Sequence, residues 1–407
     1  MNNKNQFEKP LKLMKICLLL SGINVYKTQW HPLLEKVINT FLYYFNIVIL
    51  YSVIFAEIYW LLEGIQIGRD FVEMSLTTPC ITISILATLK TVNLYYKRNI
   101  VCYIIDKLKE IHPEQTDYKK NETGRLENKF NNTGTKEICN LEENHKTNEG
   151  FAKESVKLLR LVEFLLSTIS MAVLVTFLLA PLVMIYWKYY TTGEMKIKYP
   201  FSVKYWFDAY TIKFWPLVYF QQVWATIIVC LFIFGAETLF YSLCTYMEMH
   251  FRILCCQLES IQAGTTTKED LMKGVKKHQL LIHLVEKTEE LFSQPILFHF
   301  VSSSFLICLS AFNITVAEDL GSVFAFVTFL LLSLSQVSLL CFFGDKLMRS
   351  STEVSGGIYR SPWYNFNVIE KKAVLIIIIR AQKPCKLTAS NFADLNLRAF
   401  TTVITLN

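Results

Sequence analysis

Residue types that could do chemistry are sparse in this 407-residue chain, and their spacing favours packing roles. His278 and His283 lie at a spacing that does not place two metal ligands on one face of a helix. His299 is flanked by two phenylalanines, and Cys255 and Cys256 are adjacent, with the other cysteines mostly in apolar segments. The sequence has no nucleophile elbow, phosphate-binding loop or zinc motif. We therefore expect no enzyme activity, no metal site and no cofactor.

Ionisable residues inside apolar stretches are the other candidates. Glu57 and Glu237 lie in such stretches, where a carboxylate costs roughly 2.5–3.5 kcal/mol at the bilayer centre. A structural polar contact is the favoured interpretation for both, and a role in ligand or ion passage is the alternative. Near the C-terminus, Asp394, Asn396 and Arg398 could give a helix one wet face that lines a pore. The alternative there is a polar helix buried among its neighbours.

Long apolar blocks must position these residues, and they indicate a polytopic membrane protein. Hydrophobic residues make up 52% of the chain and charged residues only 18%, which is less charge than a soluble protein of this length carries. Backbone groups in lipid must be satisfied within the segment, so the blocks are expected to be helices. The predicted fold class is all-α with seven transmembrane helices, at residues 37–62, 72–96, 161–187, 214–246, 294–317, 320–344 and 387–407.

The intervening segments complete the domain organisation. An amphipathic N-terminal segment is followed by spans one to four, which include a long polar loop at 97–160 whose residues 119–150 are predicted to be disordered. Helical periodicity between spans four and five predicts two helices that extend these spans. The expected units are 1–36, 37–246, 247–293 (helices), 294–344 (spans five and six), 345–386 (a helical packing or anchor segment) and 387–407 (the final pore helix).

The distribution of lysine and arginine predicts the orientation. The N-terminal segment, the loops after spans two, four and six, and the stretch before the last helix are rich in these residues. The positive-inside rule therefore places the N-terminus and the anchor segment in the cytoplasm and the C-terminus outside. The net charge of +7 is not gathered into a basic stripe on a soluble domain, so nucleic-acid binding is not expected.

Aromatic, methionine and polar residues in the outer halves of the spans suggest a ligand pocket. If the spans pack as a bundle, these side chains approach one another around an apolar cavity with a few polar groups, which suits a small volatile molecule. The alternative for any single residue is core packing or contact with lipid. The candidate ligand-binding residues are Met74, Thr78, Phe177, Met184, Tyr219, Gln222, Phe312 and Phe324.

The C-terminal region also carries a family pattern. It begins with a Tyr-x-Ser-x-Trp turn, continues with an apolar helix that ends in Arg-x-Gln-Lys-Pro, and closes with Phe-x-x-Leu-x-Leu and a later Phe. In this chain these positions are Tyr359, Ser361, Trp363, Arg380, Gln382, Lys383, Pro384, Phe392, Leu395, Leu397 and Phe400. This pattern resembles the C-terminal signature of insect odorant receptors.

The resemblance implies a seven-span odorant receptor of the tuning type, not the shared co-receptor. It implies an odorant pocket in the outer half between spans two and six, and assembly with a co-receptor subunit into a tetrameric cation channel lined by the final helices. It also implies a subunit anchor that includes Trp363, Arg380 and Pro384, and location in the plasma membrane of olfactory sensory neuron dendrites. Family members continue past the position of Asn407, near which their extracellular gate lies, so conduction by the sequence as given is an open question.

Two other receptor classes are alternatives. A gustatory-type chemoreceptor channel would share the fold but need no dedicated co-receptor, and the Arg-x-Gln-Lys-Pro stretch favours the olfactory branch. A G-protein-coupled receptor would have an outside N-terminus, an Asp-Arg-Tyr type motif after span three and Asn-Pro-x-x-Tyr in span seven. The sequence contains neither motif.

Overall fold

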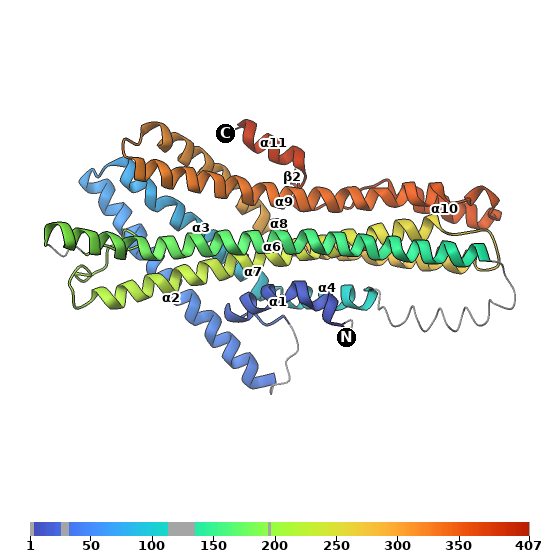
Figure 1. Cartoon of the computed structure of the whole chain (residues 1–407), viewed down its shortest axis with the longest axis horizontal. Helices are drawn as coiled ribbons and strands as arrows, with labels where there is room; N and C mark the ends of the chain where they lie inside the picture. Colours follow the sequence, from blue (N-terminus) through green and yellow to red (C-terminus); the bar gives the residue numbers. More distant parts are fainter. Residues whose placement is uncertain (1–3, 26–31, 113–134, 194–196, 407) are drawn as a thin grey trace.

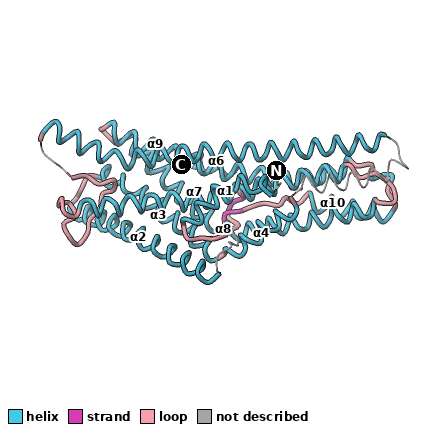
Figure 2. Tube along the Cα trace, turned by 60° about the horizontal axis from the view of Figure 1, so that its bottom comes forward, coloured by secondary structure: helices cyan, strands magenta, loops and turns pink. Residues whose placement is uncertain are grey.

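The protein is built almost entirely from helices (Figure 1). The computed structural model describes residues 4–25, 32–112, 135–193 and 197–406. Figure 2 shows that the only strands in this part of the chain are two short ones near its middle. The elements are α1 (Lys4–Leu20), α2 (Pro32–Ile67), α3 (Phe71–Tyr96), α4 (Arg98–Ile111), α6 (Thr135–Thr192), α7 (Trp215–Glu259), α8 (Thr267–Val316), α9 (Leu320–Arg360), η1 (Trp363–Asn365), α10 (Val368–Ala381), β1 (Thr388–Ala389), β2 (Ala393–Asp394) and α11 (Leu397–Leu406).

Six of the described helices are long and apolar enough to cross a membrane. They are α2, α3, α6, α7, α8 and α9, and they correspond to the first six predicted spans. The seventh prediction needs correction, because residues 388–394 form an antiparallel hairpin and the helix begins only at Leu397.

Helix α7 lies at the centre of the fold. It packs against α1, α2, α3, α6, α8 and α9, and every residue from 235 to 251 is buried. Of the most apolar 18-residue stretch of α7, 50% is buried inside the protein, whereas only 6% of the corresponding stretch of α6 is buried. A long apolar helix with so little protein contact is stable only when lipid covers its sides. The helices are therefore arranged with α7 inside and α6 at the periphery.

The helices continue past the predicted spans into a shared bundle, at the right-hand end of Figure 1. Here α7 and α8 are joined through residues 260–266, and α10 packs on α8 and α9. Helix α10 begins with a capping box, in which the side chains of Asn367 and Glu370 each accept a hydrogen bond from the other residue's backbone N–H. The positive-inside prediction places this end in the cytoplasm, and we refer to it as the inner end.

One of the polar segments differs from expectation. Residues 135–150 belong to α6, although they were predicted to be disordered, because a long helix extends readily by one hydrogen bond per residue once it has nucleated. The remaining residues of that prediction, 119–134, lie outside the described residues. The amphipathic N-terminal helix α1 buries its apolar residues Phe7, Leu11 and Met14 against protein, mainly α7.

His112 follows α4 in an enclosure of aromatic rings. Its ring centroid lies 5.2 Å from that of Phe7, 6.0 Å from that of Tyr246 and 6.1 Å from that of His250. Its Nδ1 has no hydrogen-bond partner among the described residues. Burial lowers the pKa of His112 to about 4, because the cationic form loses its hydration there. The folded protein therefore keeps His112 neutral near neutral pH.

We predict that mild acid destabilises the junction of α1, α4 and α7 through His112. His112 binds a proton at about pH 6.5 in the unfolded chain and only near pH 4 in the folded chain. The contribution of the neutral His112 to the free energy of unfolding is therefore fully present above pH 6.5 and is lost as the pH falls toward 4. The loss is at most about 3 kcal/mol. Thermal unfolding of the detergent-solubilised protein should become less pH-dependent in His112→Phe. His283→Phe, at an exposed position, is the control, and equal pH dependence in both variants would contradict the prediction.

Candidate functional site

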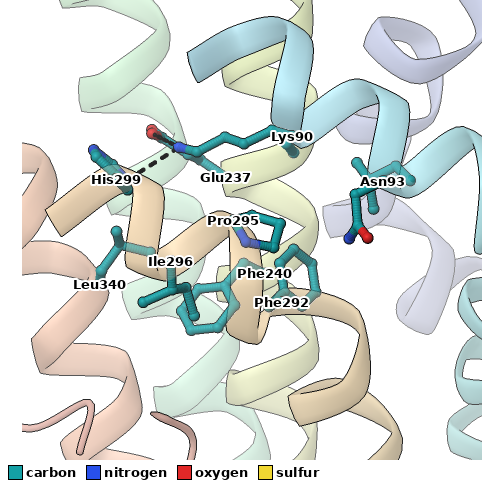
Figure 3. A pocket seen from close by; sticks show the side chains of 11 residues that line it. Lys90, Asn93, Glu237, Phe240, Phe292, Pro295, Ile296, His299 and Leu340 are labelled. Carbon is teal, nitrogen blue, oxygen red and sulfur yellow. Dashed lines mark hydrogen bonds and ion pairs between the residues drawn. The ribbon is translucent and has the colours of Figure 1, made fainter. Parts of the chain in front are cut away.

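A buried ion pair joins three helices near the inner ends of the spans (Figure 3). The Lys90 ammonium on α3 lies 2.8 Å from Oε1 of Glu237 on α7 and 3.1 Å from Nδ1 of His299 on α8. The Lys90 and Glu237 side chains are only 8% and 6% exposed. A charge at this depth requires a partner, because neither lipid nor apolar side chains can solvate it. The favoured interpretation of Glu237, a structural polar contact, fits this pairing, and any role in ion passage stays a prediction.

Helix α3 also supplies a hydrogen bond that the backbone of α8 lacks. Pro295 lies inside α8 and lacks an N–H, so the carbonyl of Leu291, four residues earlier, has no helical donor. The side-chain amide of Asn93 donates to this carbonyl. Lys97 donates to the neighbouring carbonyl of Glu290 at 2.7 Å. Asn93 is thus placed where a proline in α8 leaves an acceptor free, and Lys97, which follows α3, adds a second link between the two helices.

A small cavity lies between the ion pair and Pro295. Its volume is about 20 Å³, which is room for about one water molecule. Apart from the polar side chains already described, its wall is apolar. The lining residues are Lys90, Asn93, Leu94, Ala236, Glu237, Phe240, Phe292, Pro295, Ile296, His299 and Leu340.

A second cavity of about 50 Å³ lies nearer the outer end, between α3, α8 and α9. Thr82, a lining residue, is about 16 Å along α3 from its first residue, whereas Lys90 is about 28 Å along it. The wall combines hydroxyl groups with aliphatic and aromatic side chains, so it offers a few hydrogen-bonding groups on an apolar surface. We call it the outer cavity; it is lined by Thr82, Ile83, Leu86, Ser302, Ser303, Leu306, Phe329, Leu332, Ser333 and Gln336.

Helices α8 and α9 each line both cavities. His299 on α8 and Leu340 on α9 are in the wall of the small cavity beside the ion pair, and Ser303 and Gln336 on the same two helices are in the wall of the outer cavity. A displacement of α9 at the outer cavity would therefore also act on the helix next to the ion pair. Sequence analysis noted His299 but not this arrangement.

Three of the predicted ligand residues gather where α6 and α7 meet the loop that precedes α7. The rings of Phe177 and Phe201 have centroids 5.0 Å apart. The amide oxygen of Gln222 accepts a hydrogen bond from the Phe201 N–H at 3.1 Å. The hydroxyl of Tyr219 donates to the carbonyl of Leu178. The polar groups of Tyr219 and Gln222 are therefore engaged in part by the protein itself.

The other five predicted ligand residues are more dispersed. Met74 and Thr78 lie on α3, closer to its first residue than the outer cavity is. The hydroxyl of Thr82, which lines that cavity, donates to the Thr78 carbonyl at 2.8 Å. Met184, Phe312 and Phe324 are exposed on the protein surface, by 53%, 54% and 73%. The structure thus brings the first two close to a cavity but not the last three. The part of all eight residues in ligand binding stays a prediction.

The three predicted pore residues take different places. Asp394 lies in β2 and pairs with the Lys386 ammonium at 2.8 Å. The Asn396 side chain accepts a hydrogen bond from the Ala399 N–H at 2.9 Å, which caps the start of α11. Only Arg398 lies within α11, where its side chain is exposed. The three residues therefore do not form one helical face, because the hairpin and the cap occupy the first two.

The predicted anchor residues surround α10. Trp363 lies in η1 and packs against the core of the inner bundle. Arg380 is in the last turn of α10 and donates to the carbonyl of Lys383 at 3.2 Å, and the exposed Pro384 follows. These contacts hold the end of α10 and the start of the segment that leads to the hairpin.

Comparison with known proteins identifies the family. A model of the 7tm Odorant receptor family matches residues 118–406, which is more than half of the chain. The chain belongs to the 7tm odorant receptor family. The family is one of receptors rather than enzymes, and this odorant receptor is an odorant-binding subunit of the insect type.

Relatives and solved structures agree with this assignment. The receptor is 25% identical to putative odorant receptor 92a of Drosophila melanogaster over 364 residues, which covers 86% of this chain and 81% of the relative. It is 24% identical to putative odorant receptor 85d of the same species, with coverage of 95% and 89%. The olfactory receptor OR5 from Machilis hrabei in complex with eugenol has the same fold, with a TM-score of 0.78, 15% identity and coverage of 100% and 97%. The predicted all-helical membrane fold is confirmed.

Lys90 and Asn93 are the site residues that sequence analysis missed. A signal for Lys90 was present, since a lysine in the middle of an apolar span needs an acidic partner. Asn93 had no such signal, because its partner is a backbone carbonyl that Pro295 leaves free on a helix about 200 residues away.

We predict that removing one partner of the buried ion pair destabilises the receptor far more than removing both partners. Lys90→Met leaves Glu237 uncompensated and should cost about 3–5 kcal/mol, while Lys90→Met with Glu237→Leu should recover most of that loss. The measurement is thermal unfolding of the purified receptor, supported by its level at the cell surface. Lys107→Met, which removes an exposed ion pair with Glu110, serves as the control and should change little. Equal losses in Lys90→Met and Lys107→Met would contradict the role of burial.

Proposed function

We propose that this odorant receptor works as the tuning subunit of a cation channel, together with a co-receptor subunit, in the plasma membrane of olfactory sensory neuron dendrites. The observation that carries the proposal is the hydroxyl-lined outer cavity between three membrane-crossing helices of an odorant receptor fold. A site of this kind orients a small ligand through one or two hydrogen bonds while apolar contacts supply most of the affinity. The solved relative that is in complex with eugenol supports the same class of ligand.

The wall chemistry indicates which volatile molecules suit the outer cavity. Ser303 on α8 and Ser333 on α9 both line the outer cavity and are 3% and 6% exposed. A serine hydroxyl both donates and accepts, so alcohols, phenols, ketones and esters are all compatible, whereas a charged ligand would lack a counter-ion in this wall. We infer a small, largely apolar, uncharged ligand.

The volume of the outer cavity suggests how binding drives gating. A volume of about 50 Å³ is well below the 300–1,000 Å³ that is typical of ligand sites. A volatile ligand must therefore favour an arrangement in which α3, α8 and α9 are further apart. Because a ligand shifts an equilibrium by its differential affinity for the two states, binding would populate this wider arrangement. Met74 and Thr78, one or two turns further out on α3, would line the approach.

The inner bundle offers a surface for the co-receptor. Five apolar side chains of α10 are between 56% and 75% exposed: Val368, Ile369, Leu375, Ile376 and Ile379. An apolar helix face of this size, outside the membrane-crossing helices, is typical of a protein interface. We infer that it packs against another subunit, and that the final helix α11 is thereby brought toward a shared pore.

We predict that filling the outer cavity weakens the odorant response. Ser333→Leu places a larger apolar side chain in a cavity of about 50 Å³ and should lower the odorant-evoked current at least tenfold at equal surface level. The measurement is whole-cell current during exposure to a panel of volatile alcohols, phenols and esters that includes eugenol. Ser335→Leu, two residues along α9 on the exposed side, is the matched control and should respond normally. A normal response from Ser333→Leu would place the odorant elsewhere.

We also predict that current requires the co-receptor and the apolar face of α10. Cells that express this receptor with a family co-receptor should give an odorant-evoked cation current, and cells that express it alone should not. Ile376→Lys introduces a charge into the apolar face and should abolish both the current and co-purification of the two subunits. Met272→Lys adds the same charge at another exposed apolar position of the inner bundle and should leave both intact. An odorant-evoked current without the co-receptor would overturn the partner proposal.

A further inference from the structure

The hairpin that precedes α11 has a turn with two residues in the left-handed region. Thr388 pairs with Asp394 and Ala389 with Ala393, and the turn contains Ser390 with φ of 49° and Asn391 with φ of 62°. Inside the turn, the Asn391 N–H donates to the Thr388 hydroxyl at 3.1 Å. A left-handed position is uncommon for serine and persists when surrounding contacts determine it. Contacts with neighbouring helices therefore contribute to the geometry of the hairpin and to the point from which α11 starts.

Helix α8 holds the hairpin through a carboxylate and a hydroxyl. Glu289 accepts hydrogen bonds from the N–H of Thr388, at 2.7 Å, and from the Thr388 hydroxyl. The Ser293 hydroxyl accepts a hydrogen bond from the Ser390 N–H at 2.9 Å and donates to Glu289 at 3.2 Å. Hydrogen bonds to an ionised carboxylate are about twice as strong as neutral ones. We call this set of four residues the hairpin latch: Glu289, Ser293, Thr388 and Ser390.

Helix α9 holds the other side of the same segment. The Ser351 hydroxyl accepts a hydrogen bond from the Cys385 N–H at 3.0 Å. The backbone of Leu395 passes so close to Gly344 that a Cβ at this glycine would lie 2.5 Å from the Leu395 carbonyl oxygen. The Leu395 side chain is 1% exposed. The segment from 385 to 395 thus bridges α8 and α9.

These are also two of the three helices that form the outer cavity. Ser303 in the cavity wall and Ser293 in the latch are on one helix, about 15 Å apart along its axis. Pro295 lies between them, where α8 lacks a backbone hydrogen bond of its own and relies on Asn93. A helix bends most easily at such a point. Separation of α8 from α9 at the outer cavity would therefore change their spacing at the hairpin.

We propose that the hairpin latch transmits odorant binding from the outer cavity to α11, with Glu289 and Ser293 as positioning residues. The latch makes the position of the hairpin depend on α8, while Gly344 and Ser351 make it depend on α9. Movement of one helix relative to the other then turns or shifts the start of α11. This inference rests on the proposed function, because it assigns a route to the gating proposed there.

Hydrogen exchange on the purified full chain tests the latch without any channel activity. In Glu289→Ala the amides of Thr388 and Ser390 should exchange at least about tenfold faster than in the unmodified receptor. Glu286→Ala, at an exposed position one turn earlier on α8, is the matched control and should not change them. Addition of the panel of volatile alcohols, phenols and esters should alter exchange at 385–396 in the unmodified receptor and not in Glu289→Ala. Unchanged exchange at Thr388 and Ser390 in Glu289→Ala would overturn the latch.

Whole-cell currents with the co-receptor test the transmission. At equal surface level, Glu289→Ala and Thr388→Val should each shift the odorant concentration for half-maximal current by at least about fivefold. The double variant should be little worse than Glu289→Ala alone, since Glu289→Ala already removes the hydrogen bond that the Thr388 hydroxyl donates to Glu289. Normal responses in both variants would overturn the inference while leaving the proposed function in place. Absence of current from the unmodified receptor would contradict the proposed function alone, because the exchange experiment still decides whether the latch moves with ligand.

Discussion

Polar groups at membrane depth must find partners inside the protein, and this requirement sets the position of α3 against α7 and α8. Lys90 needs an anion and finds Glu237 on α7, and the carbonyl that Pro295 leaves free on α8 needs a donor and finds Asn93. A one-turn slip of α3 along both neighbours would leave a charge and a carbonyl unsatisfied at the same time, at a cost of several kcal/mol. The register of α3 follows from this double requirement, and both cavities depend on that register.

The same constraint makes the site a junction of several helices. The ion pair and His299 join α3, α7 and α8, and Leu340 on α9 lies in the wall of the small cavity beside them. Because α7 is buried along its inner half, it provides a fixed surface against which the other helices are positioned. The outer cavity lies beyond the ion pair, where the helices are held by weaker apolar contacts and hydroxyl groups. A ligand that enters there acts on helices fixed firmly at one end and less firmly at the other, which favours changes in their separation over sliding.

The last part of the chain is a hairpin followed by helix α11, whereas the sequence predicted a single helix. Asp394 and Asn396 are used to close the hairpin and cap α11, so their polar groups stabilise local structure. The position of α11 is then a property of what holds the hairpin, namely α8 and α9. In an odorant receptor this places the start of the final helix under the influence of the same two helices that flank the outer cavity.

The sequence by itself determined the class of fold, the six long helices and the family, because apolar block length and a short C-terminal pattern are local properties. It also favoured a structural polar contact for Glu237. Only the tertiary structure decided that its partner is Lys90, since pairing depends on which helices become neighbours. The hairpin at 388–394 was missed because Ser390 and Asn391 are compatible with both a turn and a polar helix. Hydrogen bonds that the hairpin donates to Glu289 and Ser293, about 100 residues away, favour the turn. The outer cavity likewise arises from side chains of three separate helices, and no local pattern encodes the space between them.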